Sequence, residues 1–86
     1  MRTIWKFPIP LDATIEIKMP IGATLLTVQM QGSRPMLWAI VDPASDMVTR
    51  ILRIAGTGTG EPEGRYVGTW QHHGYVWHLF DCGSRL

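Results

Sequence analysis

The 86-residue sequence predicts an all-β fold: a single domain of about seven short antiparallel strands. Apolar residues recur at every second position in most segments, which is the period of a strand. Glycine, proline and aspartate separate those segments at short intervals. The last third holds two runs rich in aromatic and β-branched residues around a short glycine turn, a β-hairpin pattern. A small antiparallel sheet, a partly closed barrel and a sandwich all fit this pattern.

Alternation places four strands in the first half of the chain, at residues 3–7, 13–19, 24–31 and 36–42. The first strand ends at Pro8, because proline has no N–H to donate to a ladder. In the third, strict alternation puts Leu26 on the face of Val28 and Leu25 on the opposite face. The fourth is apolar on both faces, which indicates a central strand.

The second half is expected to contain strands at residues 47–55, 66–71 and 75–80. Residues 47–55 also fit a helix, because Val48, Ile51 and Leu52 follow helical spacing. Their β-branched content and the glycines that follow favour a strand. The tail 83–86 is expected to fray.

The charge balance limits the classes of partner. The chain has a net charge of +1, which is too small for a protein that binds mainly phosphate backbones, so a nucleic-acid partner is not expected. Only 17% of the residues are charged, while 45% are hydrophobic. A small domain of this composition leaves apolar groups outside, which favours a homo-oligomer or a surface that a partner covers.

Cys82 is the single cysteine, so no disulfide within the chain is possible and a reducing cytoplasm fits best. No apolar run approaches the length of a membrane span, and no charged segment followed by an apolar run opens the chain. We therefore expect a cytoplasmic protein with no membrane contact.

No set of residues in the sequence predicts catalysis. Serines lie in turns or the tail, and Glu61 and Glu63 belong to a loop without a partner base, so we expect no enzyme activity and no catalytic residue. His72 and His73 are neighbours and face opposite ways in a strand, so they are poor ligands for one ion. No metal and no cofactor are expected.

The loop Gly56-Thr57-Gly58-Thr59-Gly60 is the best candidate for ligand contact. Glycines let backbone amides approach an anion, and threonine hydroxyls add donors. The competing interpretation is a flexible connection, because the lysine of a phosphate-binding loop is missing. Four tryptophans are unusual in so short a chain; most are expected to build the core, while one or two lie in a groove and stack on a base. The candidate ligand-binding residues are Arg50, Arg53, Gly56, Thr57, Gly58, Thr59, Trp70 and Trp77.

Several spaced motifs also support a family resemblance. They are Met1-Arg-Thr-Ile-Trp-Lys-Phe7, Met19-Pro20 with Gly22-Ala23, Leu37-Trp38-Ala39 with Val41-Asp42, Gly56-Thr57-Gly58, Tyr66-Val-Gly-Thr69 and Trp77-His-Leu-Phe80. On these residues the chain resembles a family of short proteins encoded by bacteriophages and prophages, catalogued as a domain of unknown function. It departs from that pattern at Asp81, where glutamate is expected, and in the length of the loop after Gly60.

The resemblance implies a phage or prophage product in the cytoplasm of an infected bacterium, and it carries no catalytic residue to transfer. The leading hypothesis is a non-catalytic binding protein that counters a bacterial antiviral defence. It would sequester a host-derived nucleotide signal or cover a host defence protein. The alternatives are a single-stranded nucleic-acid-binding small barrel, which the charge argues against, and a virion or assembly component.

Overall fold

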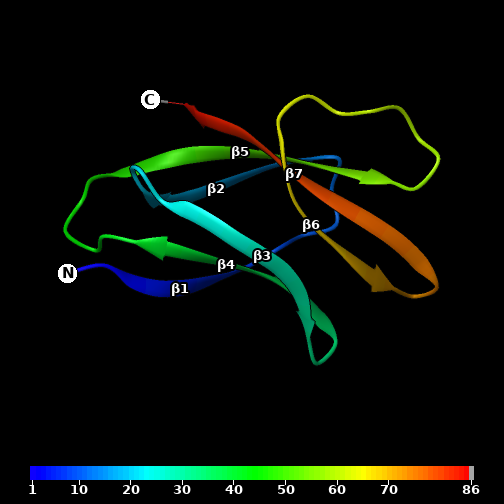
Figure 1. The fold of residues 1–86 in the computed structure, drawn as a ribbon, viewed down its shortest axis with the longest axis horizontal. Coiled ribbons are helices and arrows are strands. Elements are labelled where there is room, and N and C mark those ends of the chain that lie inside the picture. Colours follow the sequence, from blue (N-terminus) through cyan, green and yellow to red (C-terminus); the bar gives the residue numbers. More distant parts are fainter. Residues whose placement is uncertain (86) are drawn as a thin grey trace.

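The computed structural model describes residues 1–85 and contains seven β-strands in this part of the chain. They form a two-layered antiparallel sandwich (Figure 1). The strands are β1 (Thr3–Pro8), β2 (Thr14–Pro20), β3 (Thr24–Gln31), β4 (Arg34–Val41), β5 (Met47–Gly56), β6 (Arg65–His72) and β7 (Tyr75–Arg85). The predicted all-β class and strand number are confirmed. Within residues 1–85 no ladder joins the two sheets, so the fold is a sandwich and not a closed barrel.

The first sheet has the order β1-β4-β3. Its central strand, β4, alternates between fully buried and half-buried residues, so one face packs on the core and the other lies outside. Leu37, Ala39 and Val41 point inward, while Met36, Trp38 and Ile40 point outward. The apolar character of both faces, which predicted a central strand, is explained by this position.

The second sheet has the order β2-β5-β7-β6. Because β5 and β6 both pair antiparallel with β7, they run parallel to each other on either side of it. Residues 57–64 make the return connection between them, and this connection arches beyond the end of β5 (Figure 1). The β6–β7 hairpin turns at His73 and Gly74, whose φ angles of 53° and 81° suit a two-residue turn.

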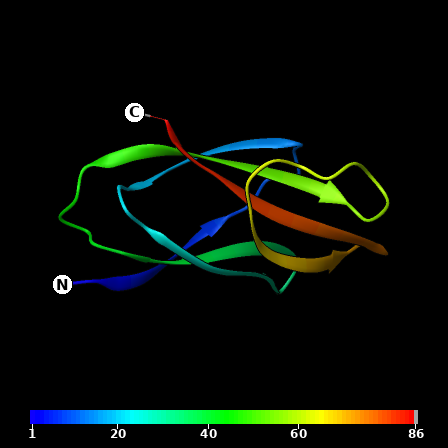
Figure 2. The same ribbon diagram turned by 45° about the horizontal axis from the view of Figure 1, so that its top comes forward.

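The core lies between the sheets and is entirely apolar among the described residues; its centre includes Met19, Leu37, Leu52 and Leu79. In Figure 2, β2 and β5 run along the top of the molecule, and β1 and β4 run along the bottom. The two layers approach most closely where β6 lies against β3. A Cβ at Gly68 would stand 2.9 Å from Val28 Cγ1 and 3.2 Å from the Val28 nitrogen, so glycine permits this approach.

The structure corrects two of the sequence predictions and decides between the two alternatives of a third. A bulge between Leu25 and Thr27 turns Leu25 toward the core and leaves Leu26 exposed, which reverses the predicted faces. Residues 83–85 of the tail predicted to fray instead extend β7, because Ser84 and Arg85 pair with β5, while Leu86 lies outside the described residues. Residues 47–55 are a strand and not a helix.

No helix in the described part of the chain is long and apolar enough to cross a membrane.

Candidate functional site

A cleft lies where the 57–64 connection approaches the segment between β1 and β2. This cleft has a volume of 610 Å³, within the range of about 300–1,000 Å³ that is usual for small-molecule pockets. The walls of this cleft come from residues 11–13, the end of β5, the 57–64 connection and β7. The lining residues include Asp12, Arg53, Gly56, Thr59 and Trp77. The predicted Gly-Thr loop therefore does border a cleft.

A second, smaller cleft adjoins the first on the side of the β6–β7 turn. It has a volume of 380 Å³ and shares Gly56, Thr59 and Trp77 with the larger cleft. Thr57 and Tyr75 line only this smaller cleft. The rings of Tyr75 and Trp77 lie 5.8 Å apart at an angle of 39°, and Tyr75 is 66% exposed. Together they give the site an aromatic wall.

Backbone hydrogen bonds fix the shape of the Gly-Thr loop. The Thr57 amide donates to the Val76 carbonyl at 3.2 Å, and the Thr59 amide donates to the Gly56 carbonyl at 3.2 Å. The Thr59 hydroxyl donates to the same Gly56 carbonyl at 2.8 Å. A side chain at Gly56 would press on the Trp77 ring, 3.3 Å from an ideal Cβ, so glycine brings this strand close to the indole. The Thr57 and Thr59 amides are thus committed to the turn and are not free to hold an anion.

Arg53 is therefore the principal anion-binding candidate in the larger cleft. Its side chain is exposed, and within residues 1–85 it forms no ion pair. Asp12 lines the same cleft and is the only carboxylate among its lining residues. One guanidinium and one carboxylate leave the cleft close to neutral, so it suits a ligand with a single anionic group better than a polyphosphate.

His78 lies beside the smaller cleft at the centre of a chain of hydroxyl groups. Its Nε2 lies 2.8 Å from the Thr57 hydroxyl, and its Nδ1 lies 2.9 Å from the Thr69 hydroxyl. Thr69 in turn contacts the Tyr66 hydroxyl. Because both ring nitrogens already have partners, the imidazole ties the loop to β6 and β7.

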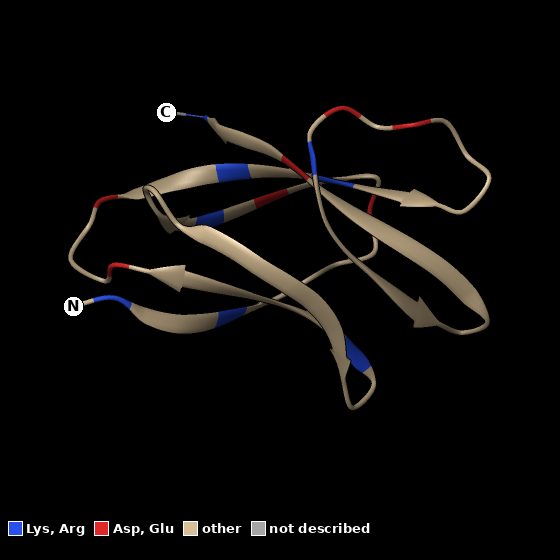
Figure 3. Ribbon diagram, viewed as in Figure 1, with Lys and Arg blue, Asp and Glu red and all other residues tan. Residues whose placement is uncertain are grey.

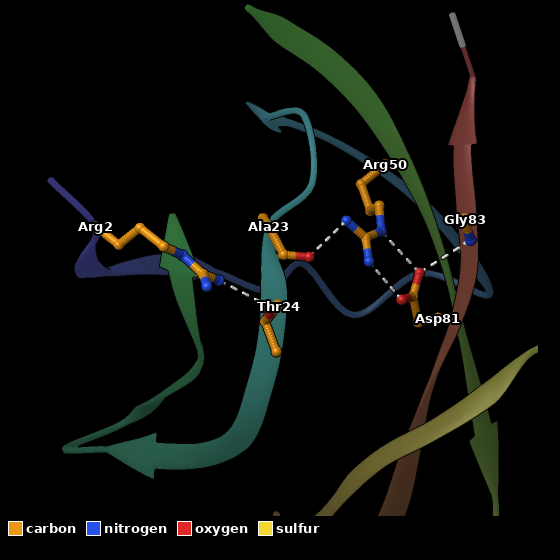
Figure 4. A network of polar contacts seen from close by, with 6 residues as sticks. All are labelled: Arg2, Ala23, Thr24, Arg50, Asp81 and Gly83. Carbon is orange, nitrogen blue, oxygen red and sulfur yellow. Dashed lines mark hydrogen bonds and ion pairs between the residues drawn. The ribbon is translucent and has the colours of Figure 1, made fainter. Parts of the chain in front are cut away.

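Arg50 lies away from these two clefts, in a half-buried ion pair between β5 and β7 of the four-stranded sheet (Figure 4). Its Nε and Nη2 donate to the two Asp81 carboxylate oxygens at 2.9 and 2.7 Å, and its Nη1 donates to the Ala23 carbonyl at 3.0 Å. The two side chains are only 13% and 12% exposed. Arg50 therefore has the contacts of a residue that holds the fold.

Burial alone would raise the pKa of the Asp81 carboxyl. The hydrogen bonds from Arg50 and the Gly83 amide, with the positive charges of Arg50 and Arg65, outweigh burial and keep that pKa below its ordinary value. The carboxylate thus stays ionised opposite Arg50 at neutral pH.

Trp70 is also placed away from the clefts, because it is 4% exposed and belongs to the core. It sits opposite Trp77 in the β6–β7 register. The Nε1 atoms of both indoles and the Nδ1 of His72 are buried without a hydrogen-bond partner among the described residues. A buried polar group without a hydrogen-bond partner costs about 1–3 kcal/mol of stability.

The structure thus brings together five of the eight predicted residues around the clefts: Arg53, Gly56, Thr57, Thr59 and Trp77. Gly58 lies in the same turn with a φ of 92° but lines neither cleft. Sequence reasoning missed Asp12 and Tyr75. The first belongs to the segment before β2, which the β2–β5 ladder and the Ile54 amide, donating to the Ala13 carbonyl at 3.0 Å, place beside the end of β5. Tyr75 was recognisable from its alternation with Trp77.

Among the described residues no group of three or more metal-ligating side chains lies together.

In a comparison with known families, residues 1–84 match the model of a domain of unknown function, DUF7352, and the chain belongs to that family. No curated protein and no solved structure is similar enough to match this chain.

Proposed function

We propose that this member of a family of unknown function is a non-catalytic binding protein whose clefts hold a nucleotide through one of its phosphate groups. The observation that carries the proposal is the pair of adjoining clefts on either side of Gly56 and Thr59, with Trp77 common to both. Because the two clefts adjoin, a base can occupy one of them while the sugar-phosphate group occupies the other.

Each part of such a ligand has a chemical counterpart in the clefts. Tyr75 and Trp77 offer aromatic surface to a planar base in the smaller cleft. Arg53 offers a guanidinium without a carboxylate partner to the phosphate in the larger one. Asp12 disfavours further negative charge beside it, so a monophosphate or a cyclic phosphodiester suits the site better than a triphosphate.

The biological setting we propose is the cytoplasm of an infected bacterium, where the protein would sequester a nucleotide signal of an antiviral defence system. Support for that setting comes from the sequence resemblance to phage and prophage proteins. A homo-oligomer stays part of the proposal on the grounds of composition.

The test is a thermal-shift and calorimetric screen against nucleoside monophosphates, cyclic dinucleotides and cyclic oligonucleotides. A ligand at about 100 times its Kd stabilises the folded state by about 2.7 kcal/mol, a rise of several degrees in Tm. Arg53→Gln should weaken binding at least tenfold. The matched control Arg34→Gln, an exposed arginine on the other sheet, should bind as the wild type does.

Two results would contradict the proposal. One is the absence of any shift with all three ligand classes at millimolar concentration. The other is an equal loss of affinity in the Arg53 and Arg34 variants, because binding would then depend on overall charge and not on the cleft.

A further inference from the structure

The outer face of the three-stranded sheet carries an apolar centre that nothing in the fold covers. Met36, Trp38 and Ile40 of β4 point away from the core and are half-buried. On β1, Ile4 lies directly opposite Ile40 and is 57% exposed. We call this surface the β4 face: the outward side chains of β1, β3 and β4 together with Arg2.

The β4 face is positively charged at its rim. Arg2, Lys6 and Arg34 belong to it, and β1, β3 and β4 contain no aspartate or glutamate. In Figure 3 the charged residues on these three strands are all blue, the colour of lysine and arginine. Asp42 directly follows β4, next to the Thr3–Val41 pair, and its carboxylate accepts a hydrogen bond from the Ala44 amide at 3.0 Å. The rest of the molecule carries all seven acidic residues.

Two of these cations reach across β4. The Lys6 ammonium donates to the Gln31 side-chain oxygen at 2.7 Å, and an Arg2 guanidinium nitrogen donates to the Thr24 hydroxyl at 3.2 Å (Figure 4). Because β4 lies between β1 and β3, both side chains span the apolar strand and shield part of it. Their acceptors are neutral, so neither positive charge is compensated.

On the other sheet, two of the five cations are paired with carboxylates of the chain. Arg50 and Arg85 are each bound to a carboxylate, Asp81 and Glu16 respectively, at 2.7 and 2.6 Å. Replacing a neutral acceptor by a carboxylate strengthens a hydrogen bond to a cation. A carboxylate from outside the chain would therefore bind Arg2 or Lys6 more strongly than Thr24 or Gln31 does.

The charge of the β4 face selects among possible occupants. A second copy in a two-fold, face-to-face contact would bring three cations against three cations, which repels. A single-stranded nucleic acid is bound by several stacked aromatic rings, and Trp38 is the only aromatic residue on this face. Aliphatic groups with a cationic rim are instead complementary to a protein surface of opposite charge.

We propose that the β4 face docks a partner protein whose contact surface has an aliphatic centre and an acidic rim. Ile4, Trp38 and Met36 supply the apolar contact, while Arg2, Lys6 and Arg34 pair with carboxylates. Three strands of about eight residues cover roughly 14 by 26 Å, which is less than half of a standard interface per partner, so the complex is transient. This surface is independent of the proposed nucleotide site, because it lies on the opposite sheet.

The experiment uses a synthetic hairpin peptide with valines on one face and glutamates along both sides as the probe. Binding to the full chain is followed by ¹H–¹⁵N NMR. We expect saturable shifts confined to β1, β3 and β4, weakened about tenfold by the double variant Arg2→Glu/Lys6→Glu. Lys18→Glu, a single charge reversal at an exposed position of β2, should change affinity little. Ile4→Thr, which keeps a β-branched residue, should weaken binding without lowering Tm.

Parallel arms use the peptide with glutamine in place of glutamate, an oligothymidylate and vesicles containing anionic lipid. The neutral peptide should bind at least several-fold more weakly than the acidic one. Absence of saturable binding of the acidic peptide below about 1 mM would overturn the proposal. So would shifts confined to the clefts, or tighter binding of the oligonucleotide or the vesicles through the same residues.

Discussion

The two sheets of this sandwich pair their cations to different extents. On the four-stranded sheet, two of the five cations, Arg50 and Arg85, are bound to carboxylates of the same chain. On the three-stranded sheet, Arg2 and Lys6 reach only neutral acceptors. Arg53 at the cleft belongs with the unpaired cations, because it has no ion-pair partner within residues 1–85. The contrast separates cations that hold the fold from cations that are left for partners, and substitutions on both sheets test it.

The largest effect is expected at Arg50. Arg50→Met leaves the Asp81 carboxylate half-buried without its partner, which should cost about 3 kcal/mol of unfolding free energy. Arg34→Met, on the β4 face, should change stability by less than about 0.5 kcal/mol. Urea denaturation of both variants measures the difference. Equal losses of unfolding free energy would show that the paired Arg50 contributes no more to stability than the unpaired Arg34.

A smaller loss is expected where the two sheets meet. Gly68→Ala introduces a Cβ 2.9 Å from Val28 Cγ1, and overpacking of this kind costs about 2 kcal/mol. Gly60→Ala is the control, because no atom lies within 4 Å of its Cβ position. Val28→Ala in the Gly68→Ala background should cost less than it does alone, as measured by a double-mutant cycle. Strict additivity would contradict the close approach of β3 and β6.

The ion pair also makes stability depend on pH. The pKa of Asp81 is lower in the folded than in the unfolded chain, so the unfolded chain binds more protons in acid. Its contribution is complete above the unfolded pKa of about 3.9 and is lost as the pH falls from there through the lower folded pKa. The free energy of unfolding of the wild type should therefore decline more steeply below pH 4 than that of Asp81→Asn. Parallel curves would mean that another carboxyl group is responsible.

The smallest effect is expected on the β4 face. Ile4 is 57% exposed, so Ile4→Thr should change the unfolding free energy by less than about 0.5 kcal/mol. Leu52→Ala, in the core of the other sheet, should cost about 2–5 kcal/mol. Chemical denaturation compares them. A large loss for Ile4→Thr would indicate that this face serves stability and not contact.

The period-two pattern predicted every strand to within a few residues, because each strand buries one face and exposes the other. It failed at Leu25 and Leu26, where a bulge shifts the register by one residue; nothing in the local composition marks a bulge. It also failed at the tail, since the pairing of Ser84 and Arg85 with β5 depends on a strand that lies far away in the sequence.

The site was predictable only where its residues are sequence neighbours. The loop from Gly56 to Gly60 and Trp77 were found, because glycine, threonine and aromatic residues have local meanings. Arg50 was placed in the site by its position in the strand order and Trp70 because it flanks the hairpin across from Trp77, yet Asp81 binds the first and the core buries the second. The tertiary structure determines which cations are paired, and it therefore decides which residues remain available to bind a ligand.

The most direct measurement of this separation is a crossed binding experiment with four proteins: wild type, Arg53→Gln, Arg2→Glu/Lys6→Glu and Lys18→Glu. Each is titrated with the best nucleotide of the screen and, separately, with the acidic hairpin peptide. Arg53→Gln should lose nucleotide affinity and keep the peptide, the double variant should do the reverse, and all four should keep the wild-type Tm to within a few degrees. A substitution that weakens both ligands equally, or that unfolds the protein, would contradict two independent surfaces built from unpaired cations.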